Sequence, residues 1–505
     1  MKKFYMTISF IIATIFLIMF VSHRSVCAQI KTMEADMVVI GGGGAGATAA
    51  LTAVQKGVKK VILLEKEADL GGTSATAGGY VWGAETHLQK AAGVKTNRDE
   101  AFNEYMEFNH YNWVDPKVVR AFIDKTAETM KWLEDNGIRY KVEGMAGMGV
   151  DAKNTQFPVD MTGAIHNFGR TIDKLAKKFT AAGGQILLNT NAKKISRGAD
   201  GKINSVTVVD KNGKTTQINT KSVILASGGF TGNEELLKKY FPEYWDSKAY
   251  HTEAVKTNIG DGITLAADAG AGLNSYATLI REPAYTFYEG ENGFNRLCSQ
   301  ANAWVNKRGE RFQNEKWQGN ASVNPLLNQP GKIGFALFDD KSVQSIAGRL
   351  KSQGQDTDLK EFYKSEDKKG EWVKVSDNWD DIARWIGADP KALKATVEKY
   401  NSFCKQGHDD DFGKDPNSLN ELLTPPFYAV KFGPLMIDTY GPVRINERME
   451  VLDKEDKSIP GLYAGGAICG QIQGLDYHFF GAALGFAINS GRLAAENAAK
   501  YISGR

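Results

Sequence analysis

A short apolar run followed by a run of glycines constrains this chain more than any other feature. Residues 37–40 read Met-Val-Val-Ile, residues 41–44 are all glycine, and an alanine-rich segment follows. Gly41, Gly43 and Gly46 match the pattern G-x-G-x-x-G. In that pattern the first glycine makes a tight turn, the second lets the backbone approach a pyrophosphate, and the third lets a helix pack closely on the strand. The segment therefore predicts a buried strand, a turn and a helix whose N-terminus binds a dinucleotide.

An acidic residue after the next apolar run strengthens this interpretation. Residues 61–64 read Val-Ile-Leu-Leu, and Glu65 follows them, 24 residues after Gly41. An acid at about this distance hydrogen-bonds the ribose of a bound dinucleotide. A glycine-rich turn without a ligand is the alternative, but the two signals together favour a nucleotide site.

A second run of small residues distinguishes between dinucleotides. Residues 71–79 read GGTSATAGG. A nicotinamide enzyme has no evident use for a second backbone cradle there, whereas the longer FAD molecule passes close to main chain beyond its pyrophosphate. At this point the chain resembles the flavoprotein family of soluble fumarate reductases, urocanate reductases and 3-ketosteroid Δ1-dehydrogenases. The resemblance implies FAD, and the run contains no histidine for covalent attachment, so we expect the FAD to be non-covalent.

The resemblance extends over nearly the whole chain. Residues 222–230 resemble the family's strand that closes over the FAD, residues 260–262 its Gly-Asp-Gly helix start beside the flavin, and residues 482–492 its last helix, whose N-terminus faces the flavin. Ala467 stands where the family usually has a glutamate, so only its backbone could contact the flavin. The residues expected to bind FAD are Gly41, Gly43, Gly44, Ala45, Gly46, Glu65, Lys66, Gly72, Thr73, Ser74, Gly78, Gly79, Ala226, Gly228, Asp261, Ala467, Ala483 and Leu484.

The resemblance also implies the domain organisation. We expect an α/β fold in which a Rossmann-type FAD-binding domain (residues 34–275 and 425–505) carries an inserted α+β capping domain (residues 276–424). The segment 305–315 matches a family pattern within the cap, and we interpret its Arg311 and Glu315 as a structural ion pair.

The first 28 residues predict a signal peptide. Lys2 and Lys3 precede an apolar run from Thr7 to Val21, and the segment 26–28 offers small residues for cleavage. A run of about 15 residues is shorter than the usual membrane span. We therefore expect export, cleavage near Gln29 and a periplasmic protein that is not held in the membrane afterwards.

Composition excludes several classes of function. With 62 basic and 59 acidic residues the net charge is +3, so nothing indicates nucleic acid as a partner. Cys298, Cys404 and Cys469 remain after cleavage, too few for a disulfide framework. No C-x-x-C-H motif for haem attachment occurs, and the histidines lack metal-ligand spacing. We therefore expect no metal, and electrons from a separate c-type cytochrome.

Four positions depart from the fumarate reductases of the family. Gly319 stands where those enzymes have the arginine that delivers a proton. Asp438 and Glu282 replace two histidines, and Tyr477 replaces a second arginine. A dicarboxylate needs cationic partners at both ends, so these departures argue against fumarate as the substrate.

The C-terminal segment resembles the ketosteroid branch instead. There a tyrosine and a glycine N–H bind a substrate carbonyl, and Tyr477 and Gly481 match them. Such a pair would stabilise a developing enolate; an aromatic wall without this role is the alternative. Tyr440 is a second candidate for orienting the substrate or supplying its proton. The next candidates are Arg281 and His478, with Arg296 and Arg444 as further cations for a single carboxylate.

These observations predict an FAD-dependent reductase of an activated C=C bond. The substrate would be an α,β-unsaturated carboxylate or an enone, receiving a hydride from flavin N5. A desaturating dehydrogenase of the ketosteroid type is one alternative. A non-catalytic flavin electron carrier is another, although a carrier has no use for an aromatic cap.

Overall fold

The computed structural model describes most of the chain. The described residues are 31–142, 152–159, 168–242, 251–252, 255–285, 294–317, 319–352, 358–474, 477 and 480–504. The expected signal peptide and His478 lie outside them, and so does the side chain of Arg296.

A six-stranded sheet forms the centre of the larger domain. Its order is β18-β19-β11-β2-β3-β7, and the pairs from β19 to β7 are parallel. The apolar run before the glycines is β2 and the run before Glu65 is β3, so the two predicted strands are neighbours. The strands are β2 (Met37–Ile40), β3 (Val61–Leu64), β7 (Gln185–Leu187), β11 (Ser222–Leu225), β18 (Glu450–Leu452) and β19 (Ser458–Ala464).

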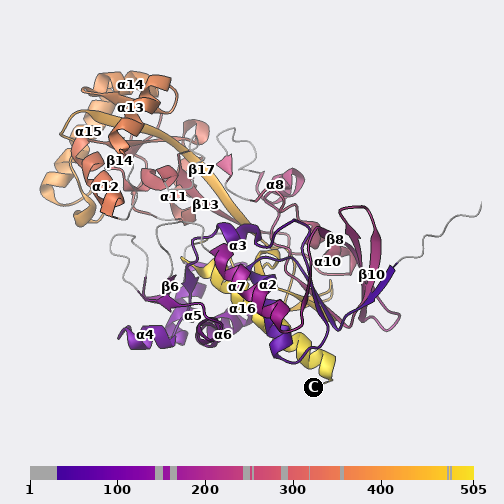
Figure 1. Ribbon diagram of the computed structural model, residues 1–505. Coiled ribbons are helices and arrows are strands. Elements are labelled where there is room, and N and C mark those ends of the chain that lie inside the picture. The colour runs from indigo at the N-terminus through magenta and orange to yellow at the C-terminus, as the bar shows by residue number, and fades with distance from the viewer. Residues whose placement is uncertain are drawn as a thin grey trace, which may run out of the picture.

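Two helices that are far apart in sequence pack against each other beside this sheet. α2 (Gly44–Gln55) follows the glycine run, and α16 (Ala482–Ser503) is the last helix (Figure 1). A Cβ atom on Gly491 would lie 2.3 Å from the carbonyl oxygen of Ala45, so the two backbones touch. α7 (Phe168–Ala181) packs on α2, and α6 (Pro116–Asp135) packs on α16 and on α5 (Arg98–Phe108).

Two smaller sheets complete the larger domain. β1 (Lys31–Glu34), β10 (Thr215–Asn219), β9 (Ile203–Asp210) and β8 (Thr190–Arg197) form one of them, in that order. β4 (Val81–Trp82), β6 (Thr155–Pro158) and β5 (Tyr140–Lys141) form the other. The short helices are α3 (Gly72–Thr76), α4 (His87–Ala91), α8 (Glu234–Tyr240) and α10 (Asp261–Asp268).

The inserted segment forms a separate lobe with its own hydrophobic clusters (Figure 1). Its sheet has the order β12-β17-β15-β14, and β13 and β16 also pair with β17. The strands are β12 (His251–Thr252), β13 (Thr278–Ala284), β14 (Ala303–Val305), β15 (Gly334–Phe338), β16 (Val373–Ser376) and β17 (Phe427–Tyr440). The helices are α11 (Gly319–Leu327), α12 (Asp340–Ser352), α13 (Leu359–Lys369), α14 (Trp379–Ile386) and α15 (Pro390–Gln406).

The long strand β17 connects the two lobes (Figure 1). Tyr428, Val430 and Phe432 belong to a cap cluster, whereas Met436 and Tyr440 belong to the core of the larger domain. The C-terminal end of β17 therefore carries side chains of the return segment into the region beside α16.

A buried ion network stabilises the cap, as expected for Arg311 and Glu315. Arg311 Nε lies 2.9 Å from Glu315 Oε1, and its Nη2 lies 3.0 Å from Asp409 Oδ2. Lys414 Nζ lies 3.2 Å from Glu315 Oε2. Since all four side chains are buried, removing one partner would leave an uncompensated charge. The pair is structural.

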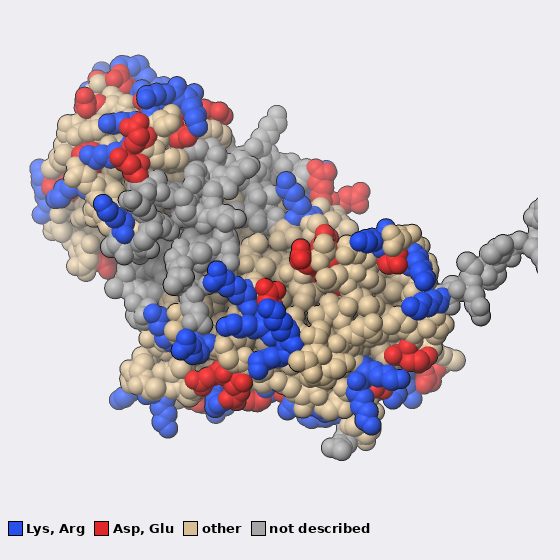
Figure 2. Space-filling view, viewed as in Figure 1, with Lys and Arg blue, Asp and Glu red and all other residues tan. Residues whose placement is uncertain are grey.

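Charged side chains of both signs are spread over the face shown in Figure 2, with blue side chains gathered near its centre. α7 carries exposed basic residues in this region, namely Arg170, Lys174, Lys177 and Lys178.

Candidate functional site

Protein packing alone requires two of the three motif glycines. Gly41 has φ +104°, and a Cβ there would lie 2.4 Å from the carbonyl oxygen of Ala226. A Cβ on Gly46 would lie 1.8 Å from the carbonyl oxygen of Gly41. Gly41 therefore permits the turn after β2, and Gly46 permits the close approach of α2 to that strand.

Gly43 differs from them in a way that points to a ligand. Its φ is −74°, which any residue can adopt, and a Cβ there would meet no protein atom closer than 3.5 Å. Gly43 lines the main pocket of the larger domain and is the N-cap of α2, where no side chain accepts the helix's free N–H groups. A side chain at this position would fill space beside those N–H groups, which is where an anion binds at a helix N-terminus.

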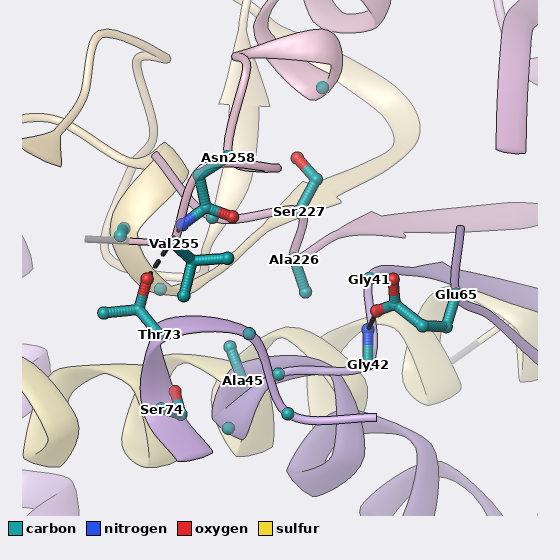
Figure 3. Close-up of a pocket in the computed structure, with 18 of the residues that line it drawn as sticks. Gly41, Gly42, Ala45, Glu65, Thr73, Ser74, Ala226, Ser227, Val255 and Asn258 are labelled. Carbon is teal, nitrogen blue, oxygen red and sulfur yellow. Dashed lines mark hydrogen bonds between the residues drawn. The ribbon is translucent and has the colours of Figure 1, made fainter. Parts of the chain in front are cut away.

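Glu65 is held at the wall of the same pocket by two backbone amides. Its Oε2 accepts a hydrogen bond of 2.7 Å from the N–H of Gly42, and its Oε1 accepts one of 3.0 Å from the N–H of Glu67 (Figure 3). The carboxylate therefore has a fixed direction beside the glycine turn, as expected for a group that binds ribose hydroxyls.

The pocket runs from Glu65, past the glycine turn, to the first turn of α16. It brings together most of the residues expected to bind FAD, from seven separate segments. Those that line it are Gly41, Gly43, Gly44, Ala45, Glu65, Lys66, Gly72, Thr73, Ser74, Ala226, Gly228, Asp261, Ala467, Ala483 and Leu484.

Gly46, Gly78 and Gly79 do not line this pocket among the described residues. Gly46 lies outside the pocket and allows α2 to pack closely on β2, as described above. A Cβ on Gly78 would lie 2.9 Å from the ring of Tyr80, and Gly79 has φ +83°. The carbonyl oxygen of Gly79 accepts a hydrogen bond from the hydroxyl of Tyr140. These two glycines therefore shape the loop before β4, a role that glycine content alone does not distinguish from ligand contact.

Ser227 and Asn258 line the pocket but are not among the predicted residues. The Asn258 Nδ2 donates a hydrogen bond of 2.8 Å to Thr73 Oγ1 (Figure 3). The Ser227 Oγ is buried and has no hydrogen-bond partner within the described part of the chain. Ser227 could have been predicted to line the pocket, because it follows Ala226 in the sequence. Asn258 could not, because it lies in no recognisable motif.

Lys66 and Asp261 reach the pocket from different segments and form an ion pair. The Lys66 Nζ lies 2.9 Å from Asp261 Oδ2, and it also donates to the carbonyl oxygen of Thr257. Asp261 begins α10, as the Gly-Asp-Gly pattern predicted. The pair joins the ribose side of the pocket to the segment that carries Asn258.

Comparison with known proteins agrees with this geometry. Residues 36–478 match the FAD binding domain family. The chain belongs to this family of flavoproteins. FAD is its cofactor, and the open N-cap at Gly43, the fixed Glu65 carboxylate and the unpartnered Ser227 hydroxyl all fit it.

The similar proteins include enzymes and a solved enzyme structure. The chain is 28% identical over 489 residues to a vinyl phenol reductase of Lactiplantibacillus plantarum, covering 92% of this chain and 96% of that one. It is 29% identical over 466 residues to a fumarate reductase (cytochrome) of Shewanella frigidimarina, covering 92% and 77%. A flavocytochrome c3 fumarate reductase structure in its open conformation superposes with a TM-score of 0.72 at 25% identity, covering 95% and 80%. The chain is accordingly an FAD-dependent oxidoreductase.

Asp438 and Tyr440, on the same face of β17, line the pocket near α16. The Tyr440 hydroxyl donates a hydrogen bond of 3.0 Å to the carbonyl oxygen of Ala483. Burial holds the pKa of Tyr440 well above its ordinary value, so this tyrosine is neutral. With its proton directed at a backbone carbonyl, Tyr440 positions the first turn of α16.

Tyr477 and Gly481 lie together, as predicted, but their arrangement differs from two donors directed at a substrate. Burial raises the pKa of Tyr477, and the nearby backbone of Ala483 and Gly481 acts in the opposite direction. Gly481 is the N-cap of α16 and has φ +82°. No side chain at this cap accepts a hydrogen bond from the free N–H groups of the helix. Neither Tyr477 nor Gly481 lines the pocket among its described residues.

The predicted cations do not converge on the pocket. Arg281 is buried opposite Met436 in the β13–β17 pair, and its guanidinium donates to Asn324 Oδ1 of α11. Arg444 is paired with Asp456. Gly319 begins α11. Neither arginine lines the pocket among the described residues.

The described residues contain neither a metal-binding cluster nor a membrane-spanning helix. No group of three or more acidic, histidine or cysteine side chains is placed to hold a metal ion. No described helix is long and apolar enough to cross a membrane.

Proposed function

We propose that this protein reduces an activated C=C bond in an α,β-unsaturated carboxylate or an enone. The observation that carries the proposal is the flavin end of the FAD pocket, where Asp438 and Tyr440 meet the first turn of α16 beside Tyr477. Two similar proteins, the vinyl phenol reductase and the fumarate reductase, are named for reduction of C=C bonds. The former matches this chain over nearly its whole length.

The chain's own residues would hold the cofactor and polarise the substrate. Backbone N–H groups at the start of α2 would bind the pyrophosphate, and Glu65 the ribose hydroxyls. Bound FAD supplies the two-electron, hydride-transfer chemistry of the site. The Tyr477 O–H, beside the first turn of α16, would donate to the substrate carbonyl and stabilise negative charge that develops on it.

The loss of cations favours a substrate with at most one carboxylate. Gly319, Asp438 and Tyr477 occupy positions at which the fumarate reductases carry cations or histidine. Arg281 and Arg444 are engaged elsewhere. A dicarboxylate would therefore lack the charge-assisted hydrogen bonds that its second end needs.

We further propose that the protein is exported to the periplasm and receives electrons from a separate c-type cytochrome. The basic start, the apolar run and the small residues at 26–28 support export. The absence of a C-x-x-C-H motif in the sequence supports a donor on another chain. Cell fractionation with N-terminal sequencing tests the first point; a cytoplasmic protein that begins at Met1 would refute it.

A screen with reduced methyl viologen as electron donor tests the activity. The holoenzyme should oxidise the viologen in the presence of an enone such as 4-phenyl-3-buten-2-one or a monocarboxylate such as cinnamate. Fumarate should be a poor substrate. If no C=C compound supports oxidation, but an electron acceptor supports desaturation of a steroid ketone, then the dehydrogenase alternative replaces this proposal.

A further inference from the structure

We propose that Asp438 determines the substrate class of this site. Its carboxyl group donates a hydrogen bond to an uncharged carbonyl oxygen of the substrate and disfavours a carboxylate in the same place. This inference deepens the proposed function and rests on it for the identity of the ligand as substrate.

The position of Asp438 supports a role toward a ligand. Asp438 and Tyr440 are two residues apart on β17, and both line the pocket at its α16 end. Asp438 is 7% exposed. Ile280 lies opposite it in the β13–β17 pair, so its neighbour across the strands is apolar. The carboxyl group is therefore buried and lines the pocket.

The partners of Asp438 leave its charge uncompensated. Its Oδ1 accepts a hydrogen bond of 2.8 Å from the N–H of Thr439, and no salt bridge to it occurs within the described part of the chain. The titratable groups that face it are the neutral hydroxyls of Tyr440 and Tyr477, and Glu282 lies beyond Tyr477. The nearest arginine in the pair of strands, Arg281, lies opposite Met436 and binds Asn324 instead.

These surroundings favour the acid form of the carboxyl group. Burial raises the pKa of Asp438 from 3.8 to about 7, and only the Thr439 amide acts in the opposite direction. A buried carboxylic acid is a hydrogen-bond donor, and an ionised one is an acceptor only. The acid form therefore suits a ketone oxygen, whereas a bound carboxylate would place a second negative charge beside a group that already ionises with difficulty.

A matched pair of saturated ligands tests this inference without turnover. 4-Phenyl-2-butanone and 3-phenylpropionate have similar size and differ in the ketone and the carboxylate. Each is titrated into the oxidised, FAD-loaded holoenzyme, and the flavin absorption spectrum reports binding. If only the acid form of Asp438 binds the ketone, its affinity should fall about 30-fold between about pH 6 and about pH 8.5. The propionate should bind more weakly than the ketone at the lower pH.

Two substitutions of Asp438 distinguish the effect of its hydrogen-bond donor from the effect of the volume of its side chain. Asp438→Asn keeps a donor without a charge, so ketone binding should be retained and lose its pH dependence, and propionate binding should improve. Asp438→Leu removes the donor, so ketone affinity should fall about 10-fold or more. Asp377→Asn, at an exposed cap position, should behave as the wild type. The FAD content of each variant controls for folding.

Three outcomes would overturn the inference: ketone affinity independent of pH in the wild type, equal ketone affinities of the Asn and Leu variants, or tighter binding of the propionate than of the ketone. The failure of the proposed function is a separate result. In that case the ligands bind as expected, but no C=C compound is reduced by the viologen-reduced enzyme.

Discussion

The two ends of the FAD pocket are built in different ways. At the ribose and pyrophosphate end, one continuous segment from Gly41 to Glu65 supplies a turn, a helix start and a carboxylate held by backbone amides. At the α16 end, Asp438, Tyr440 and Tyr477 come from the return strand and the segment before the last helix. The first end depends on backbone shape, and the second on individual side chains. Substitutions at the first end should therefore affect cofactor and fold, and those at the second end should affect turnover.

The largest effect is expected for Gly46→Ala. The added Cβ would lie 1.8 Å from the carbonyl oxygen of Gly41, and two backbone segments would have to separate. We expect the free energy of unfolding to fall by about 3 kcal/mol, with loss of bound FAD. Urea unfolding and FAD content measure both. Gly348→Ala in α12, where a Cβ meets no atom within 4 Å, is the control and should not destabilise.

Tyr477→Phe tests the α16 end of the pocket. It removes the O–H that we propose to polarise the substrate. Turnover with reduced viologen should fall about 100-fold, while FAD content stays at the wild-type level. Tyr111→Phe, at a tyrosine that is 64% exposed, serves as the matched control. Near wild-type turnover of Tyr477→Phe would show that the site lies elsewhere.

Gly43→Ala tests whether a glycine of the same motif is needed for contact with the ligand and not for packing within the protein. Its backbone angles suit alanine, and no protein atom lies closer than 3.5 Å to the added Cβ. The stability of the FAD-free protein should change by less than about 1 kcal/mol, whereas FAD should bind about 10-fold more weakly or worse. Calorimetric titration of FAD into the FAD-free protein measures this. Unchanged FAD affinity would contradict the assignment of the pyrophosphate to the start of α2.

The smallest effect is expected for Tyr440→Phe. The variant loses one hydrogen bond, from the hydroxyl to the carbonyl oxygen of Ala483, which is worth about 1 kcal/mol. We expect a fall of that size in stability and a change in turnover below about 10-fold. A loss of turnover as large as that of Tyr477→Phe would instead make Tyr440 a group that acts on the substrate.

The sequence predicted the first end well because its signals are local. A strand, a glycine turn and a helix follow each other within 24 residues, and each glycine has a steric reason that a pattern can state. Gly78 and Gly79 show the limit of this reasoning. They resemble a second cradle in composition, yet one lies against Tyr80 and the other adopts a positive φ in a loop.

The second end depends on contacts between distant segments. The departures at Gly319, Asp438 and Tyr477 were visible in the sequence, and of these three residues Asp438 lines this end of the pocket. The contacts formed at this end of the pocket were not visible in the sequence. No pattern in the sequence states that the Tyr440 hydroxyl donates to the carbonyl oxygen of Ala483, or that Asn258 donates to Thr73.

The sequence by itself determined the family and the cofactor, and it predicted the strand, glycine turn and helix that we propose to hold the phosphates. These follow from backbone requirements of neighbouring residues, which a short pattern encodes. Only the tertiary structure decided which side chains at the far end face the pocket and which are already satisfied within the protein. Burial and hydrogen-bond partners set the charge and direction of Asp438 and Tyr477, and both arise when β17 and the start of α16 come together.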